Sequence, residues 1–165
     1  MGKKHYIKKC FILVTFLIIS YGCNINVSNF SEIKIKIENK EVKFYKKTKP
    51  YSGKIIDVYE NGGLKSEFST LDGIKDGDFI QYYENGLIQT SSNFKDGKLE
   101  GKFKSLYNNG IEQTITFYLN NLRHGSYEEF YTDGKIKKCS SFYKGFKIGK
   151  SYEFFESGGV AIYSF

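Results

Sequence analysis

The chain contains few of the residues that bind metals or act as nucleophiles. Its 165 residues include only two histidines, His5 and His124, and three cysteines, Cys10, Cys23 and Cys139, with no Cys-x-x-Cys spacing. A zinc site needs several such ligands close together, so the sequence predicts no metal site and no cofactor. Outside the first 22 residues and Cys23, a cysteine–histidine pair could be built only from Cys139 and His124, which occupy unrelated positions in the pattern described next. The sequence therefore favours a protein that is not an enzyme.

Glycine, by contrast, is abundant and recurs every 24 residues. Two complete series are Gly53, Gly77, Gly101, Gly125 and Gly149, and Gly62, Gly86, Gly110, Gly134 and Gly158. A third series, Gly73, Gly97 and Gly145, is interrupted only by Asn121, and asparagine is the residue that best tolerates positive φ after glycine. A fixed period of this length is typical of a protein built from stacked repeats.

Each repeat has the pattern of a β-hairpin. The segment Tyr82–Gly86 runs from two aromatic residues into an Asn-Gly pair, which predicts a type I′ turn. A second reversal is expected at Lys95–Gly101. No helix is expected in residues 53–165, because no segment between glycines has a helical apolar period. The predicted fold is all-β: an array of antiparallel β-hairpins with a 24-residue repeat in one elongated sheet.

These motifs resemble a known family. The pattern Tyr-x-Asn-Gly, an aromatic residue and then Asp-Gly-x-x-x-Gly is similar to the MORN repeat variant, and the resemblance extends over residues 42–165. Such repeats occur in bacterial proteins of the YwqK antitoxin type. The resemblance implies an antiparallel array of hairpins and an antitoxin-like role. Where such repeats often carry tryptophan, this chain has Phe79, Phe103 and Tyr127.

The N-terminus has the features of an export signal. Four lysines precede an apolar stretch from Cys10 to Tyr21, which is short for crossing a bilayer, so residues 1–22 are predicted to be a signal peptide. The segment Ser20-Tyr21-Gly22-Cys23 resembles the lipobox of bacterial lipoproteins, which implies acylation of Cys23 and a lipid anchor in the bacterial cell envelope. Simple secretion is the alternative.

Residues 23–41 are predicted to form the tether and one capping strand, Ile33–Ile37, ahead of the repeats in 42–165. The formal charge of +7 includes four signal-peptide lysines, which leaves +3 on the mature chain. That charge gives no support for nucleic-acid binding, and nothing indicates a small-molecule substrate. Lys46, Lys47 and Lys49 form a basic cluster that is either a solvated surface or a contact for anionic head groups.

Two surfaces are candidates for a partner. One is an aromatic column with one residue from each repeat: Tyr59, Tyr83, Tyr107, Tyr131 and Phe155. It could stack sugars or contact a protein, or it could simply cover the turn ends and replace a thin core. The other is a final strand from Val160 to Phe165 that contains no charge. With Val160, Ile162, Tyr163 and Phe165, it is expected to pair by strand addition with a partner protein or with a second copy.

The sequence therefore predicts an envelope-anchored interaction module that binds a protein and resembles an antitoxin. A structural or adhesive surface lipoprotein that binds glycan or host protein is the alternative.

Overall fold

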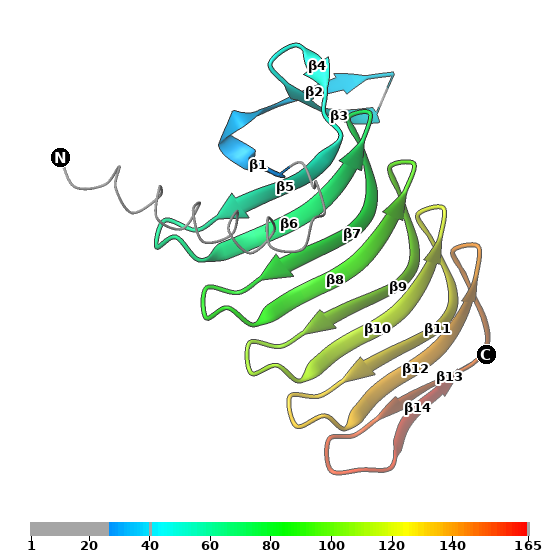
Figure 1. The fold of residues 1–165 in the computed structure, drawn as a ribbon. Helices are drawn as coiled ribbons and strands as arrows, with labels where there is room; N and C mark the ends of the chain where they lie inside the picture. Colours follow the sequence, from blue (N-terminus) through cyan, green and yellow to red (C-terminus); the bar gives the residue numbers. More distant parts are fainter. Residues whose placement is uncertain (1–26, 40, 165) are drawn as a thin grey trace, which may run out of the picture.

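The computed structural model describes residues 27–39 and 41–164 (Figure 1). The predicted signal peptide, Cys23 and Phe165 lie outside these residues. The described part contains two sheets and no α-helix, which confirms the all-β prediction. Among these residues no helix meets the length and apolarity that a membrane span requires.

The main sheet has eleven strands in the order β1-β5-β6-β7-β8-β9-β10-β11-β12-β13-β14. Every neighbouring pair from β5 to β14 is antiparallel, whereas β1 pairs with β5 in parallel. The strands span β1 Val27–Asn29, β5 Gly53–Val58, β6 Leu64–Leu71, β7 Ile74–Tyr82, β8 Ile88–Lys95, β9 Lys98–Leu106, β10 Glu112–Leu119, β11 Leu122–Phe130, β12 Ile136–Tyr143, β13 Phe146–Phe154 and β14 Val160–Ser164.

A smaller sheet lies at the N-terminal end of the array (Figure 1). It contains β2 Ile33–Glu38, β3 Glu41–Lys46 and β4 Lys49–Pro50, preceded by the 3-10 turn η1 Phe30–Glu32. The strands β2 and β3 form an antiparallel pair. We call residues 27–50 the cap.

The Asn-Gly reversals correct one prediction from the sequence. Each is a three-residue loop in which only the glycine has positive φ, as at Gly110 with φ 84°, so the predicted type I′ turn is wrong there. The amide of Gly110 donates to the carbonyl of Tyr107, which closes a type I turn before the glycine. The Asn109 side chain accepts a hydrogen bond from the amide of Ile111 at 3.0 Å. This hydrogen bond forms an Asx turn at Asn109. The chain therefore reverses with the asparagine at negative φ, whereas a type I′ turn would need positive φ at both the asparagine and the glycine.

The type I′ geometry occurs instead at the opposite edge of the sheet, in four two-residue reversals. Both central residues have positive φ in the pairs Asp72-Gly73, Asp96-Gly97, Asn120-Asn121 and Lys144-Gly145. Asn121 has φ 69°, which confirms the backbone requirement inferred from its replacement of glycine. Each of these turns also bonds to the repeat before it; for example, the amide of Asn121 donates to the carbonyl of Leu99 at 3.0 Å.

The hydrophobic core is confined to the end of the sheet that the cap covers. It consists of Ile33 and Phe44 from the cap with Tyr51, Ile55 and Phe68 from the first repeat. Ile55 is completely buried. A single twisted sheet has no opposite layer, so no aromatic side chain of the later repeats is fully buried among the described residues, and most are half-buried. The cap therefore closes only one end of the array.

Candidate functional site

The aromatic column predicted as a partner surface forms a hydrogen-bonded ladder between repeats. The four tyrosine hydroxyls donate at 2.6–2.8 Å to backbone carbonyls in the following repeat, namely those of Tyr82, Leu106, Phe130 and Phe154. All four tyrosines are half-buried, and only Phe155, at 57%, is well exposed. Because the hydroxyls of Tyr59, Tyr83, Tyr107 and Tyr131 already have partners, the geometry favours their structural interpretation over stacking on a ligand.

A second ladder joins the Asn-Gly loops of successive repeats. The Asn85 amide donates to the carbonyl of Asn108 at 3.0 Å, and Asn109 repeats this contact with Thr132 at 3.3 Å. Asp133 has no amide to donate, but the neighbouring Lys135 reaches the carbonyl of Glu156 at 3.2 Å and also pairs with Asp133 at 2.8 Å. The lysine thus replaces the missing donor, so aspartate can occupy an asparagine position without interrupting the ladder.

One face of the sheet carries paired aromatic rings along its length. The pairs Phe79–Phe94, Phe103–Tyr118 and Tyr127–Phe142 each have ring centroids 6.0 Å apart in edge-to-face geometry. We call these six residues the aromatic face.

Cations of the same chain cover much of the aromatic face. The Lys75 ammonium lies 4.5 Å and 4.9 Å from the ring centroids of Phe79 and Phe94, and burial lowers its pKa. The Arg123 guanidinium lies 5.0 Å from Tyr127 and 5.3 Å from Phe142. Because two of the three ring pairs already hold a cation, this face offers little free ring surface for stacking sugars.

Acidic residues along the sheet are held by neighbouring donors. Burial alone would raise the pKa of Glu129, but hydrogen bonds from Lys137 and Tyr127 lower it below its ordinary value. Burial, assisted by a hydrogen bond to Glu67 at 2.9 Å, raises the pKa of Tyr82 to about 12. Each of these groups is thus paired with a neighbouring side chain of the sheet.

His124 and Cys139 are not brought together as a nucleophile pair. His124 lies in β11 with its ring 5.2 Å from that of Tyr143, and its Nδ1 is buried without a hydrogen bond. Cys139 is a free thiol within β12, where its Cα partners are Glu128 and Tyr152. Among residues 27–39 and 41–164, no cluster of histidine, cysteine, aspartate and glutamate side chains could hold a metal ion.

Exposed apolar side chains gather at the reversal between β12 and β13. Phe146 is 77% exposed, and its Cα partner Tyr143 is 52% exposed. Ile148 lies two residues beyond Phe146 on the same strand face, and Leu122 lies against Gly145 in the turn. We call Leu122, Tyr143, Phe146 and Ile148 the C-terminal turn patch.

The fold does not require apolar residues at these positions. The reversal between β8 and β9 has the same geometry, and it carries Lys95 and Lys98 where the later one carries Tyr143 and Phe146. The segments that carry the patch contain basic residues and no acidic ones. Residues 117–127 and 141–152 contain Arg123, Lys144, Lys147 and Lys150 and no carboxylate. Tyr143 and Phe146 stand at the repeat positions that hold Lys95 and Lys98 two repeats earlier, and this difference between equivalent turns is the signal of the patch in the sequence.

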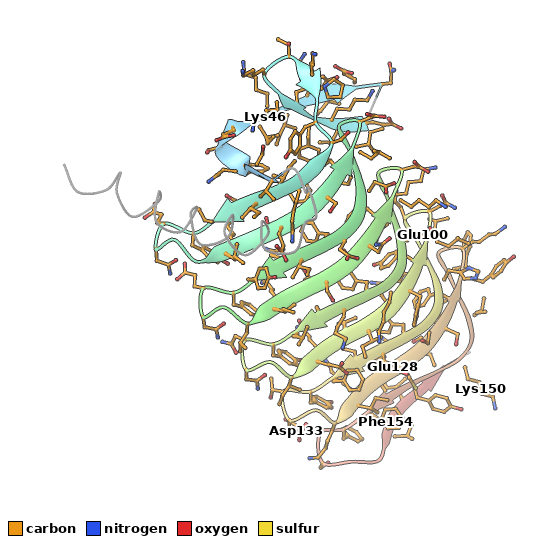
Figure 2. All side chains as sticks on the ribbon, viewed as in Figure 1. Lys46, Glu100, Glu128, Asp133, Lys150 and Phe154 are labelled. Atoms are coloured by element: carbon orange, nitrogen blue, oxygen red, sulfur yellow. The ribbon has the colours of Figure 1, made fainter. Side chains whose placement is uncertain are left out.

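The predicted edge strand is present as β14. It pairs only with β13 and forms one boundary of the main sheet among the described residues, with Val160 and Ile162 about half exposed. Figure 2 shows Phe154 and Lys150 of the neighbouring β13 at the end of the array opposite to Lys46 in the cap. The patch and the edge strand therefore lie at the same end of the molecule.

Comparison with known proteins supports the repeat assignment. Residues 75–96 and 123–144 match the family model described as the MORN repeat variant. No curated protein and no solved structure matches the chain. The two matched segments are the second and fourth hairpin repeats, and the hairpins between and after them have the same turn geometry. The two matched segments are thus MORN-variant repeats, and such repeats are generally found in modules that interact with proteins or membranes.

Proposed function

We propose that this protein is a non-enzymatic interaction module, anchored to the bacterial envelope through Cys23, that binds a protein partner at the C-terminal end of its repeat array. The observation that carries the proposal is the C-terminal turn patch. Four apolar side chains are 47% to 77% exposed there, although an earlier turn of identical geometry holds lysines instead. A contiguous apolar patch on a solvent-exposed surface is characteristic of binding sites.

The chemistry of the patch indicates the kind of partner. Its apolar centre would bury against apolar side chains, and Lys144, whose ammonium lies 5.5 Å from the ring centroid of Tyr143, favours a partner with a carboxylate at the rim. The adjacent β14 offers unpaired backbone groups to a strand of the same partner. A toxin is the class of partner that the family resemblance implies.

The binding experiment compares three forms of the protein as baits, with captured proteins identified and quantified by mass spectrometry. The variant Tyr143→Lys with Phe146→Lys copies the turn at Lys95 and Lys98, so it is expected to fold. Burying such aromatic side chains is worth roughly 1.5–3 kcal/mol each, so this variant should bind the captured partner at least about tenfold more weakly. The control is Leu64→Lys with Ile88→Lys, at exposed positions whose counterpart in the third repeat is Glu112.

The outcomes separate the candidate functions. Loss of one captured protein with the patch variant, and its retention with the control, supports the proposal, and the identity of that protein shows whether it is a toxin. Capture that both variants retain would contradict binding at the patch. An adhesive lipoprotein would instead bind purified glycan or host matrix protein, but the aromatic face, where rings could stack on sugars, already carries Lys75 and Arg123.

The anchor is tested separately. Acyl chains contribute about 0.8 kcal/mol per buried CH₂, so several chains hold a protein on a membrane almost irreversibly. We expect Cys23→Ser to move the protein from the membrane fraction to the soluble or secreted fraction and to abolish incorporation of labelled palmitate. Wild-type protein that is already soluble and unlabelled would establish secretion instead.

A further inference from the structure

The positive charge of the mature chain is concentrated in the cap. Residues 27–50 contain seven lysines and three glutamates, a net charge of +4, whereas residues 51–165 contain 14 basic and 15 acidic residues, a net charge of −1. Two of the three cap glutamates are already paired: Glu38 with Lys43 at 3.6 Å, and Glu32 with Lys46 at 3.0 Å. The cap is therefore strongly basic on a molecule that is otherwise nearly neutral.

Several cap lysines have no carboxylate partner among the described residues. Lys34, Lys47 and Lys49 form no ion pair there, and the Lys36 ammonium lies 4.6 Å above the ring of Tyr45. Lys34 alternates with Ile33 and Ile35, so it lies on the opposite face of β2. Lys47 and Lys49 flank the reversal between β3 and β4 and are left to interact with solvent or with an external anionic surface.

The cap also exposes an apolar stripe that extends from the core. Ile33, Ile35 and Ile37 share one face of β2, and Val42 and Phe44 are the Cα partners of Ile37 and Ile35. Ile33 and Phe44 are buried in the core, but Ile35 and Val42 are each 50% exposed and Ile37 is 77% exposed. We call Ile35, Ile37 and Val42 the cap stripe. The first repeat covers one end of this row of side chains and leaves the cap stripe uncovered.

The position of the cap in the chain adds a third observation. Val27, the first residue of β1, follows Cys23 by four residues, so even a fully extended segment spans only about 14 Å. The opposite end of the array is far from this point. Ten steps from β1 to β14 at about 4.8 Å each place the last strand roughly 48 Å away along the sheet.

We propose that the cap is a second membrane-binding element, in which the cap stripe inserts into the interface of an anionic lipid bilayer while Lys47 and Lys49 contact its head groups. The inference rests on the proposed location at the membrane. Exposed apolar residues together with lysines are the combination that binds a bilayer surface, and one lipid anchor is strengthened by a second, basic signal. Contact at the cap holds the array by its N-terminal end and presents the C-terminal turn patch away from the bilayer.

A vesicle flotation experiment tests the cap without the acyl anchor. The protein used is the chain from residue 23 with Cys23→Ser, and circular dichroism of every variant verifies the β-fold. The probes are vesicles of phosphatidylcholine alone and of phosphatidylcholine with about one third phosphatidylglycerol. We expect partition into the anionic vesicles to exceed that into neutral vesicles by about tenfold or more and to fall steeply with added salt.

Two matched variants locate the contact. Ile35→Ser, Ile37→Ser and Val42→Ser together should lower partition into anionic vesicles about tenfold or more, because their apolar area no longer enters the interface. The control Leu64→Ser, Ile88→Ser and Ile136→Ser removes three apolar side chains that are 37–38% exposed on the repeats, and it should partition like the parent.

Each result bears on the inference directly. Equal partition of the cap-stripe variant and the parent would overturn it, and so would binding that does not depend on phosphatidylglycerol or that is lost in the repeat control instead. Capture of the protein partner through the C-terminal turn patch is measured independently with the Tyr143→Lys and Phe146→Lys variant. A cap that fails to bind vesicles while that capture persists removes the membrane contact alone.

Discussion

Gly110 provides a direct test of how the turns define this array. It lies in the loop between β9 and β10, in the middle of the sheet, with φ 84°. A Cβ at this position would have only one neighbour, the Cδ1 atom of Leu87 at 3.8 Å, which is an ordinary van der Waals contact. The cost of a side chain here therefore comes almost entirely from the left-handed backbone and not from a steric clash.

That cost can be estimated. The left-handed region costs about 1–2 kcal/mol for a residue with a Cβ, and a β-branched side chain tolerates it less well. We expect Gly110→Val to lower the free energy of unfolding by about 2–3 kcal/mol. For a chain of this size each kcal/mol corresponds to about 2–4 °C in melting temperature, so the shift should be roughly 4–12 °C.

Lys95→Val is the control, because Lys95 is an exposed strand residue with an ordinary backbone conformation. Both variants are compared by thermal melting and by urea unfolding monitored by circular dichroism. Surface substitutions of the control type change stability by less than about 0.5 kcal/mol. Equal melting temperatures for the two variants would refute the assignment of a required left-handed glycine at this turn.

Two further predictions concern the ladder and the sheet edge. Tyr107→Phe removes the hydroxyl that donates to the carbonyl of Phe130 at 2.8 Å, so it should lower the free energy of unfolding in urea by about 0.5–1.5 kcal/mol. The control Tyr143→Phe, at a ring that is 52% exposed, should leave the free energy of unfolding unchanged. Equal effects of the two substitutions would contradict the ladder. Ile162→Lys with Tyr163→Pro should abolish strand-added association in sedimentation velocity while the melting of the first four repeats is retained, since proline removes an amide donor from β14. Association that survives both changes would show that β14 is not the contact.

The spacing of the glycines was sufficient to predict the repeat, because a turn that needs positive φ favours glycine at that position in every repeat. Asn121 shows this well: its amino-acid type alone indicated a left-handed residue, and the structure has it at φ 69°. The type of turn was harder to predict. Asn-Gly is the strongest signal for a type I′ turn, but here the asparagine side chains bond to the amide two residues ahead, and the type I′ turns use Asp-Gly, Asn-Asn and Lys-Gly pairs instead.

The role of the aromatic column also required the structure. In the sequence, Tyr83 and Tyr107 are compatible with a binding surface and with a structural ladder, because each of these two roles would place an aromatic ring in every repeat. The ladder becomes visible only when the hydroxyl of Tyr83 is found 2.8 Å from the carbonyl of Leu106, a contact between residues 23 positions apart. Conversely, the sequence shows that Tyr143 and Phe146 differ from their repeat counterparts, but only the structure shows that they are exposed.

The sequence by itself thus determined the hairpins, their period and the positions of their reversals, because the need for positive φ depends on the residues of the turn itself. Only the tertiary structure decided which apolar side chains are covered. Ile33 and Ile37 belong to one alternating strand, yet Ile33 is 9% exposed and Ile37 is 77% exposed. The difference arises because burial depends on what lies across from a side chain: the first repeat packs over one end of β2 and no described segment packs over the other.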